Sequence, residues 1–116
     1  MHTRTNTISP QERARRKGIL FDYFSVSIYE TQSELLVHTR INHDNAVRFG
    51  RTARGMIRYG KPDAHRILEL AIEDRAHAHS ILARAEELPV RTPEDADALN
   101  EIRRICKRTL ALVPSR

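Results

Sequence analysis

Apolar residues recur every three or four positions over three long stretches of the chain, a spacing that predicts amphipathic helices. The predicted helices cover 32–59, 62–88 and 93–112, and a further helix begins near residue 10. Thr31-Gln32-Ser33-Glu34 is a capping box, and Gly60 can end the second helix in a left-handed conformation. Because the connections are short, we expect 32–59 and 62–88 to form an antiparallel hairpin. The sequence therefore predicts an all-α fold, a compact bundle of three to four helices.

The segment 24–29 supports two interpretations. Phe24, Val26 and Ile28 alternate with Ser25 and Ser27, which is the pattern of a strand. Leu20, Phe21, Phe24 and Ile28 also share one helical face, and we expect the first helix to cover 10–29. A strand at 24–29 would allow a ribbon-helix-helix DNA-binding fold with helices at 32–41 and 45–59. The helical register continues across Asn42-His43-Asp44, which argues against that fold.

The predicted helix 32–59 separates apolar from basic residues at roughly 100° per residue. Small residues at the middle of the apolar face predict the close approach of another helix. The apolar face carries Leu35, Thr39, Ala46, Phe49, Gly50, Ala53, Met56 and Ile57. The opposite face carries Arg40, Arg48, Arg51, Arg54 and Arg58, here called the arginine ridge, and Lys61 follows it.

The net charge of +5 is spread unevenly along the chain. Residues 1–62 hold eleven Lys/Arg against five Asp/Glu, residues 63–98 hold four against nine, and residues 99–116 hold five against one. This alternation indicates either that the acidic segment neutralises the arginine ridge, or that the ridge faces a polyanion. Arginine is favoured in the second case because its planar fork holds two phosphate oxygens.

A second basic cluster lies in the last predicted helix, and an N-terminal cluster at 13–17 could extend the same surface. The candidate nucleic-acid-binding residues are Arg40, Arg48, Arg51, Arg54, Arg58, Lys61, Arg103, Arg104, Lys107 and Arg108. No aromatic residues interleave with the ridge, and no base-reading motif is present. We therefore expect contacts to the phosphate backbone that weaken with salt.

Catalytic and metal-binding patterns are weak. Asp74-Arg75-Ala76-His77 has the acid-x-x-His spacing of di-iron bundles, but the helical wheel places His77 on the polar side of its helix. Arg58 and His65 have the spacing of some ribonuclease motifs, but Gly60 and Pro62 separate them. We expect no enzyme activity, no metal site and no cofactor.

Two residues on apolar stripes need a separate explanation. Asp74 lies inside the apolar stripe of 62–88, so we expect it to form a buried ion pair with an arginine of another helix. Cys106 lies on the apolar stripe of the last helix, and we expect it to be an inert buried thiol.

The chain is expected to form one helical domain, 1–116, with a flexible basic arm at 1–9. A single cysteine and an apolar run (19–28) too short to span a bilayer predict a cytoplasmic protein without a membrane partner. The predicted function is that of a small accessory or regulatory protein that binds nucleic acid through the arginine ridge. The alternative is a non-enzymatic adaptor or inhibitor whose helices dock on an acidic protein surface. A homodimer is compatible with both.

Overall fold

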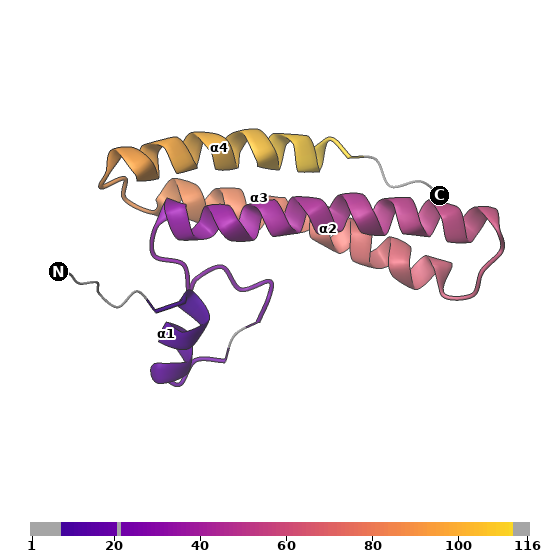
Figure 1. Cartoon of the computed structure of the whole chain (residues 1–116), viewed down its shortest axis with the longest axis horizontal. Helices are drawn as coiled ribbons and strands as arrows, with labels where there is room; N and C mark the ends of the chain where they lie inside the picture. Colours follow the sequence, from indigo (N-terminus) through magenta and orange to yellow (C-terminus); the bar gives the residue numbers. More distant parts are fainter. Residues whose placement is uncertain (1–7, 21, 113–116) are drawn as a thin grey trace.

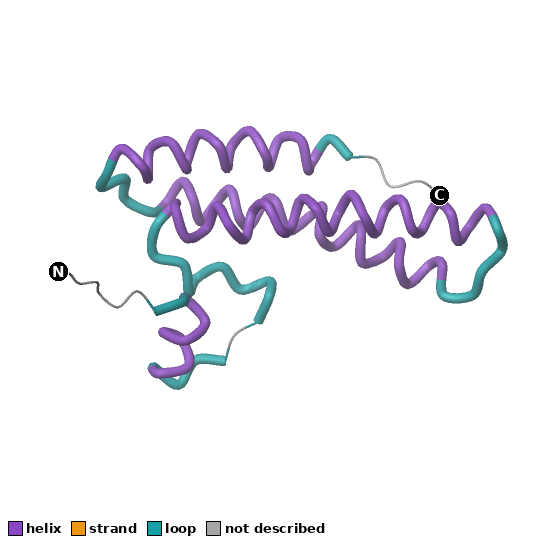
Figure 2. The backbone as a smooth tube through the Cα atoms, viewed as in Figure 1, coloured by secondary structure: helices purple, strands orange, loops and turns teal. Residues whose placement is uncertain are grey.

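The computed structural model describes residues 8–20 and 22–112, and this part of the chain forms four helices without a strand (Figures 1 and 2). The helices are α1 (Pro10–Arg16), α2 (Gln32–Arg58), α3 (Ala64–Glu87) and α4 (Pro93–Leu110). The molecule is elongated, 57 × 30 × 25 Å. The predicted all-α bundle is confirmed, and the three long helices lie within a few residues of their predicted bounds.

Helices α2 and α3 form the expected antiparallel hairpin (Figure 1). At the end of α2, Gly60 adopts a left-handed φ of 63°, and the amide of Lys61 donates to the carbonyl of Met56 at 2.8 Å. This is the Schellman pattern that closes a helix. The next helix begins at Ala64 rather than at the predicted Pro62, because Asp63 also takes a left-handed φ of 68° and turns the chain.

Helix α4 packs against the first part of α2 and the last part of α3, and it supplies the third side of the core (Figure 1). The side chains of Leu35, Ile81 and Ile102 are fully buried where the three helices meet. The tip of the hairpin extends past the end of α4 (Figure 1). As a result Phe49, Met56 and Ile57 on the apolar face of α2 are only half-buried.

The first helix is much shorter than the predicted 10–29. It ends at Arg16 because Gly18 takes a left-handed φ of 75°. The amide of Gly18 then donates to the carbonyl of Arg15 (3.0 Å), and the amide of Ile19 donates to the carbonyl of Ala14 (2.9 Å). These two bonds are again the Schellman pattern, so a glycine after a basic last turn ends this helix early.

The described residues between α1 and α2 form turns, neither a helix nor a strand (Figure 2). The amide of Ser25 donates to the carbonyl of Asp22, and the amide of Tyr29 donates to the carbonyl of Val26. Helix α2 continues without a break through 42–44. The ribbon-helix-helix alternative is therefore wrong on both of its requirements, the strand at 24–29 and the separation of 32–41 from 45–59.

Two arginines hold these turns on the hairpin. The guanidinium of Arg84 on α3 donates to the carbonyls of Tyr29 (2.7 Å) and Ser27 (3.2 Å). The guanidinium of Arg13 on α1 donates to the carbonyl of Ile28 at 2.7 Å and to both carboxylate oxygens of Glu34 at 3.0 Å. Charge-assisted bonds of this kind are the stronger class of hydrogen bond in proteins, so the segment is tied to both α2 and α3.

A buried histidine pair lies beneath the same segment. Nε2 of His38 on α2 is 2.9 Å from Nε2 of His77 on α3, and Nδ1 of His38 is 3.1 Å from the hydroxyl of Tyr29. Both imidazoles are more than nine-tenths buried. The prediction that His77 lies on a polar, solvated face is wrong, because the N-terminal segment covers a side of the hairpin that the helical wheel treats as exposed.

Asp74 is buried as expected, with 5% of its surface exposed, but the expected ion pair is absent. Among the described residues its carboxylate has neither an ion-pair partner nor a hydrogen-bond donor; only its backbone carbonyl accepts a bond, from Asn42 at 2.9 Å. Burial, with a smaller effect of Glu73, raises the pKa of Asp74 from 3.8 to about 6.

Within the described residues no helix is long and apolar enough to cross a membrane.

Candidate nucleic-acid interface

The arginine ridge runs along the solvent face of α2. All five of its side chains, Arg40, Arg48, Arg51, Arg54 and Arg58, are exposed, and so is Lys61 in the turn that follows. Within the described part of the chain none of the five forms an ion pair. The predicted neutralisation of the ridge by the acidic segment 63–98 is therefore not observed.

Arginines elsewhere in the molecule hold carboxylates. Arg13 pairs with Glu34, and Arg84 pairs with Glu87. In the C-terminal cluster Arg103 binds both carboxylate oxygens of Glu86 at 2.6 and 2.7 Å. The acidic residues of α3 thus neutralise part of α4 rather than the ridge.

The remainder of the C-terminal cluster is divided. Arg104 pairs with Glu101 one turn earlier on the same helix. Lys107 and Arg108 are exposed and form no ion pair with a described residue. Of these two, only Arg108 lies beside the ridge, since it lines the hollows between α2 and α4.

A groove of about 700 Å³ separates the ridge from α4. Its basic residues are Arg40, Arg48, Arg51 and Arg108, while Asp44 and Glu101 contribute negative charge on its two walls. The groove therefore carries both positive and negative charges. A polyanion lying along it would meet carboxylates as well as guanidinium groups.

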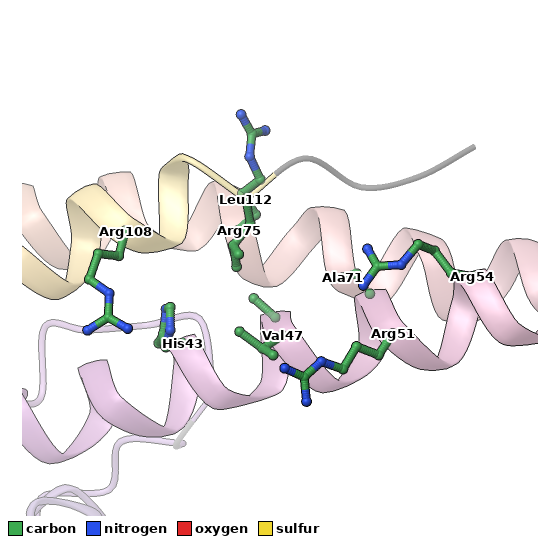
Figure 3. Close-up of a pocket in the computed structure, with 10 residues that line it drawn as sticks. His43, Val47, Arg51, Arg54, Ala71, Arg75, Arg108 and Leu112 are labelled. Atoms are coloured by element: carbon green, nitrogen blue, oxygen red, sulfur yellow. The ribbon is translucent and has the colours of Figure 1, made fainter.

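A second hollow lies where α4 ends against α2 and α3; we call it the α4-end pocket (Figure 3). Its volume is about 340 Å³, and its floor consists of the small residues Ala46, Gly50 and Ala71. A Cβ added to Gly50 would meet no atom within 4 Å. The close helix approach expected at the middle of this face is therefore absent at Gly50, and the space remains open.

Basic side chains from all three helices line this pocket, and none of its described lining residues carries a carboxylate. They are Arg51, Arg54, Arg75, Arg108 and His43. In Figure 3 the guanidinium groups of Arg51 and Arg54 extend along α2, while that of Arg108 comes down from α4. Nε of Arg75 donates to the carbonyl of Leu110 at 3.1 Å, which places a positive charge at the carboxyl end of α4.

The imidazole of His43 has a defined orientation. Its Nδ1 is 2.8 Å from the hydroxyl oxygen of Thr109, and that hydroxyl donates its single proton to the carbonyl of Ile105 at 2.9 Å. His43 must therefore donate through Nδ1, which leaves Nε2 as the acceptor in the neutral ring. Burial lowers the pKa of His43, Arg108 lowers it further, and Asp44 opposes both.

The predicted site residues thus divide into two groups. Arg40, Arg48, Arg51, Arg54 and Arg108 lie around the two connected hollows, and the other five do not. Arg58 and Lys61 lie near the hairpin tip, Arg103 and Arg104 hold carboxylates, and Lys107 is exposed on α4 outside both hollows. Sequence reasoning missed Arg75 and the part played by His43. Neither could be found without knowing that α4 ends opposite them.

Chemistry of other kinds has little support in the described residues. No group of three or more His, Cys, Asp or Glu side chains is arranged there to hold a metal ion. Cys106 is fully buried, and burial raises the pKa of its thiol to about 11, so it remains protonated near neutral pH.

Comparisons with protein-family models, with curated proteins and with solved structures found no match for this chain.

Proposed function

We propose that this protein is a nucleic-acid-associated accessory or regulatory factor that holds the phosphate backbone on the arginine ridge. The observation that carries the proposal is that five exposed arginines lie on one helix face without an ion-pair partner among the described residues. In the acidic segment, Glu86 is bound to Arg103 and Glu87 to Arg84.

Phosphate is the anion that this arrangement suits best. Each guanidinium presents a planar fork that holds two phosphate oxygens, and α2 spaces its arginines along a nearly straight line. Contacts of this kind position a nucleic acid without reading its sequence. The binding should therefore be weakly specific and strongly dependent on salt.

The test is a fluorescence-anisotropy titration of generic DNA and RNA at about 50 mM and about 200 mM salt. Five phosphate contacts predict a loss of affinity of about 100-fold for a single strand and about 500-fold for a duplex between these two conditions. Absence of binding at the lower salt concentration would overturn the proposal.

Charge-reversal variants locate the site. Arg51→Glu with Arg54→Glu should abolish binding, because both side chains belong to the ridge and line the α4-end pocket. The matched control is Arg66→Glu with Arg91→Glu, which changes the net charge equally at two exposed positions away from the ridge. Equal losses in the two double variants would mean that net charge, rather than the ridge, governs binding.

A second candidate function is docking on an acidic protein surface. Val37 and Ile41 are exposed on α2 (59% and 49%), and they line a hollow of about 500 Å³ between α2 and the N-terminal segment. Apolar residues beside a basic ridge are typical of protein interfaces. This candidate replaces the first if nucleic acids fail to bind and Val37→Ser with Ile41→Ser abolishes binding of an acidic protein partner.

A further inference from the structure

We propose that the α4-end pocket receives the terminal phosphomonoester of a nucleic-acid strand, while the rest of the strand follows the groove between α2 and α4. This inference rests on the proposed function and assigns one chemical group of the ligand to one part of the interface. Its first support is charge, because the described residues that line the pocket include four arginines and no carboxylate. The neighbouring groove includes Asp44 and Glu101.

The concentration of positive charge suits a monoester better than a diester. An internal phosphodiester carries a single negative charge, whereas a phosphomonoester carries about −1.5 to −2 at pH 7. Arginines of α2, α3 and α4 line the pocket, and their positive charges add there, although the guanidinium of Arg75 points past Leu112 in Figure 3. The more highly charged end of a strand should therefore occupy this position.

The shape of the pocket points the same way. Its volume of about 340 Å³ is at the lower end of the range for ligand pockets, about 300–1,000 Å³. The end of α4 bounds it on one side through Leu112, and the floor is made by helices α2 and α3. A pocket of this size can hold a single phosphate group, and it is continuous with the groove through the residues that line both hollows.

The exit lies in the groove. The two hollows share His43, Val47, Arg51 and Arg108 along their common border. A strand whose end sits in the α4-end pocket can therefore continue past Arg51 and Arg108 towards Arg48 and Arg40. The ridge then contacts the following phosphates, as the proposed function requires.

His43 provides a further contact. Because Nδ1 is engaged by Thr109, Nε2 is the ring nitrogen free to carry a second proton and donate to a phosphate oxygen. A bound dianion would favour the protonated ring. Binding of a terminal phosphate should therefore be visible as a change in the NMR signals of this imidazole.

The experiment compares short single-stranded oligonucleotides of one sequence, with an internal fluorescent label and a hydroxyl or a phosphate at the 5′ or 3′ end. We expect one phosphorylated form to bind the full-length protein about tenfold or more tightly than the hydroxyl form, as for charge-assisted hydrogen bonds in a partly desolvated site. Equal affinities for the hydroxyl form, the 5′-phosphorylated form and the 3′-phosphorylated form would overturn the inference while leaving the proposed function intact.

Two glycine variants separate the pocket from the overall charge. Gly50→Leu places a side chain into the open space above the pocket floor and keeps every arginine. It should remove the preference for phosphorylated ends and preserve binding of the hydroxyl form. Gly55→Leu is the matched control, since it makes the same change in α2 outside the pocket, again with no atom within 4 Å of the new Cβ.

Thermal unfolding of both variants establishes that they are folded, and Arg54→Gln provides a variant that leaves the floor unchanged. A preference for phosphorylated ends that persists in both Gly50→Leu and Arg54→Gln would place the terminal phosphate elsewhere. If no oligonucleotide binds, the proposed function fails. A titration with a nucleoside monophosphate, followed through the His43 imidazole signals, then tests the pocket alone: a shift lost in Gly50→Leu supports it, and no shift overturns it.

Discussion

Replacing Asp74 by asparagine should make the protein more stable at pH 8 and should have little charge-related effect near pH 4. The residue is only 5% exposed, and its carboxylate has no partner among the described residues. Asparagine has nearly the same shape but carries no charge. The variant therefore removes the electrostatic cost of burying the carboxylate and changes the packing little.

The magnitude follows from the pKa of Asp74. The folded state raises this pKa from 3.8 to about 6, chiefly through burial. A carboxyl group with a raised pKa destabilises the folded state wherever it must be ionised, which is above about pH 6. The difference between the two pKa values sets an upper bound of about 3 kcal/mol on this cost to the free energy of unfolding, because water near the carboxylate screens part of the cost. Most of this cost disappears as the pH falls from 6 towards 4, because the carboxyl group then takes up its proton in the folded state.

Urea unfolding of the wild type and of Asp74→Asn, at several pH values between 8 and 4, measures this directly. The stability difference between the two proteins cancels the contributions of the histidines, which titrate in the same range. The asparagine amide can add a constant packing or hydrogen-bonding cost, but that cost does not change with pH. A difference that stays constant from pH 8 to pH 4 would refute the reasoning.

Two further predictions concern the N-terminal segment. Burial, with a smaller effect of His77, lowers the pKa of His38 to about 4, so the contribution of the neutral His38 to stability should fall by about 3 kcal/mol as the pH drops from 6.5 to 4. Urea unfolding measures this as the stability difference between the wild type and His38→Gln, which cancels the opposite contribution of Asp74. A difference that does not change with pH would contradict the assignment. Gly18→Ala should lower the midpoint of thermal unfolding, because Gly18 has a left-handed φ of 75° that costs a residue with a Cβ about 1 kcal/mol; Gly50→Ala, at an unstrained helical position, is the control and should raise it.

The long helices could be predicted from the sequence because their signals are local. Ser9, Thr31 and Thr92 each accept a bond from the amide three residues later, as the capping pattern requires. The error at 17–29 was also local. Gly18 follows three basic residues, which is the signature of a helix end, but the shared apolar face of Leu20, Phe24 and Ile28 suggested continuation.

The errors at His77 and Asp74 have a different origin. A helical wheel finds one apolar face, but α3 has a second covered side, where the turns after α1 pack over His38 and His77. Which side chains meet there depends on contacts between residues far apart in the chain. The same holds for the α4-end pocket, since its basic residues come together only because α4 ends beside Ala71 and Gly50.

The hairpin tip that extends past the end of α4 has a consequence for motion. The first part of α2 and the last part of α3 are covered by α4 and by the N-terminal segment, whereas near Gly60 no other described element packs on the two helices (Figure 1). Regions with few buried apolar contacts open locally at a lower free-energy cost than the core. Backbone amides near Arg58 should therefore exchange hydrogen with solvent sooner than those near Leu35. The ridge thus runs from a well-packed base to a tip that opens more readily.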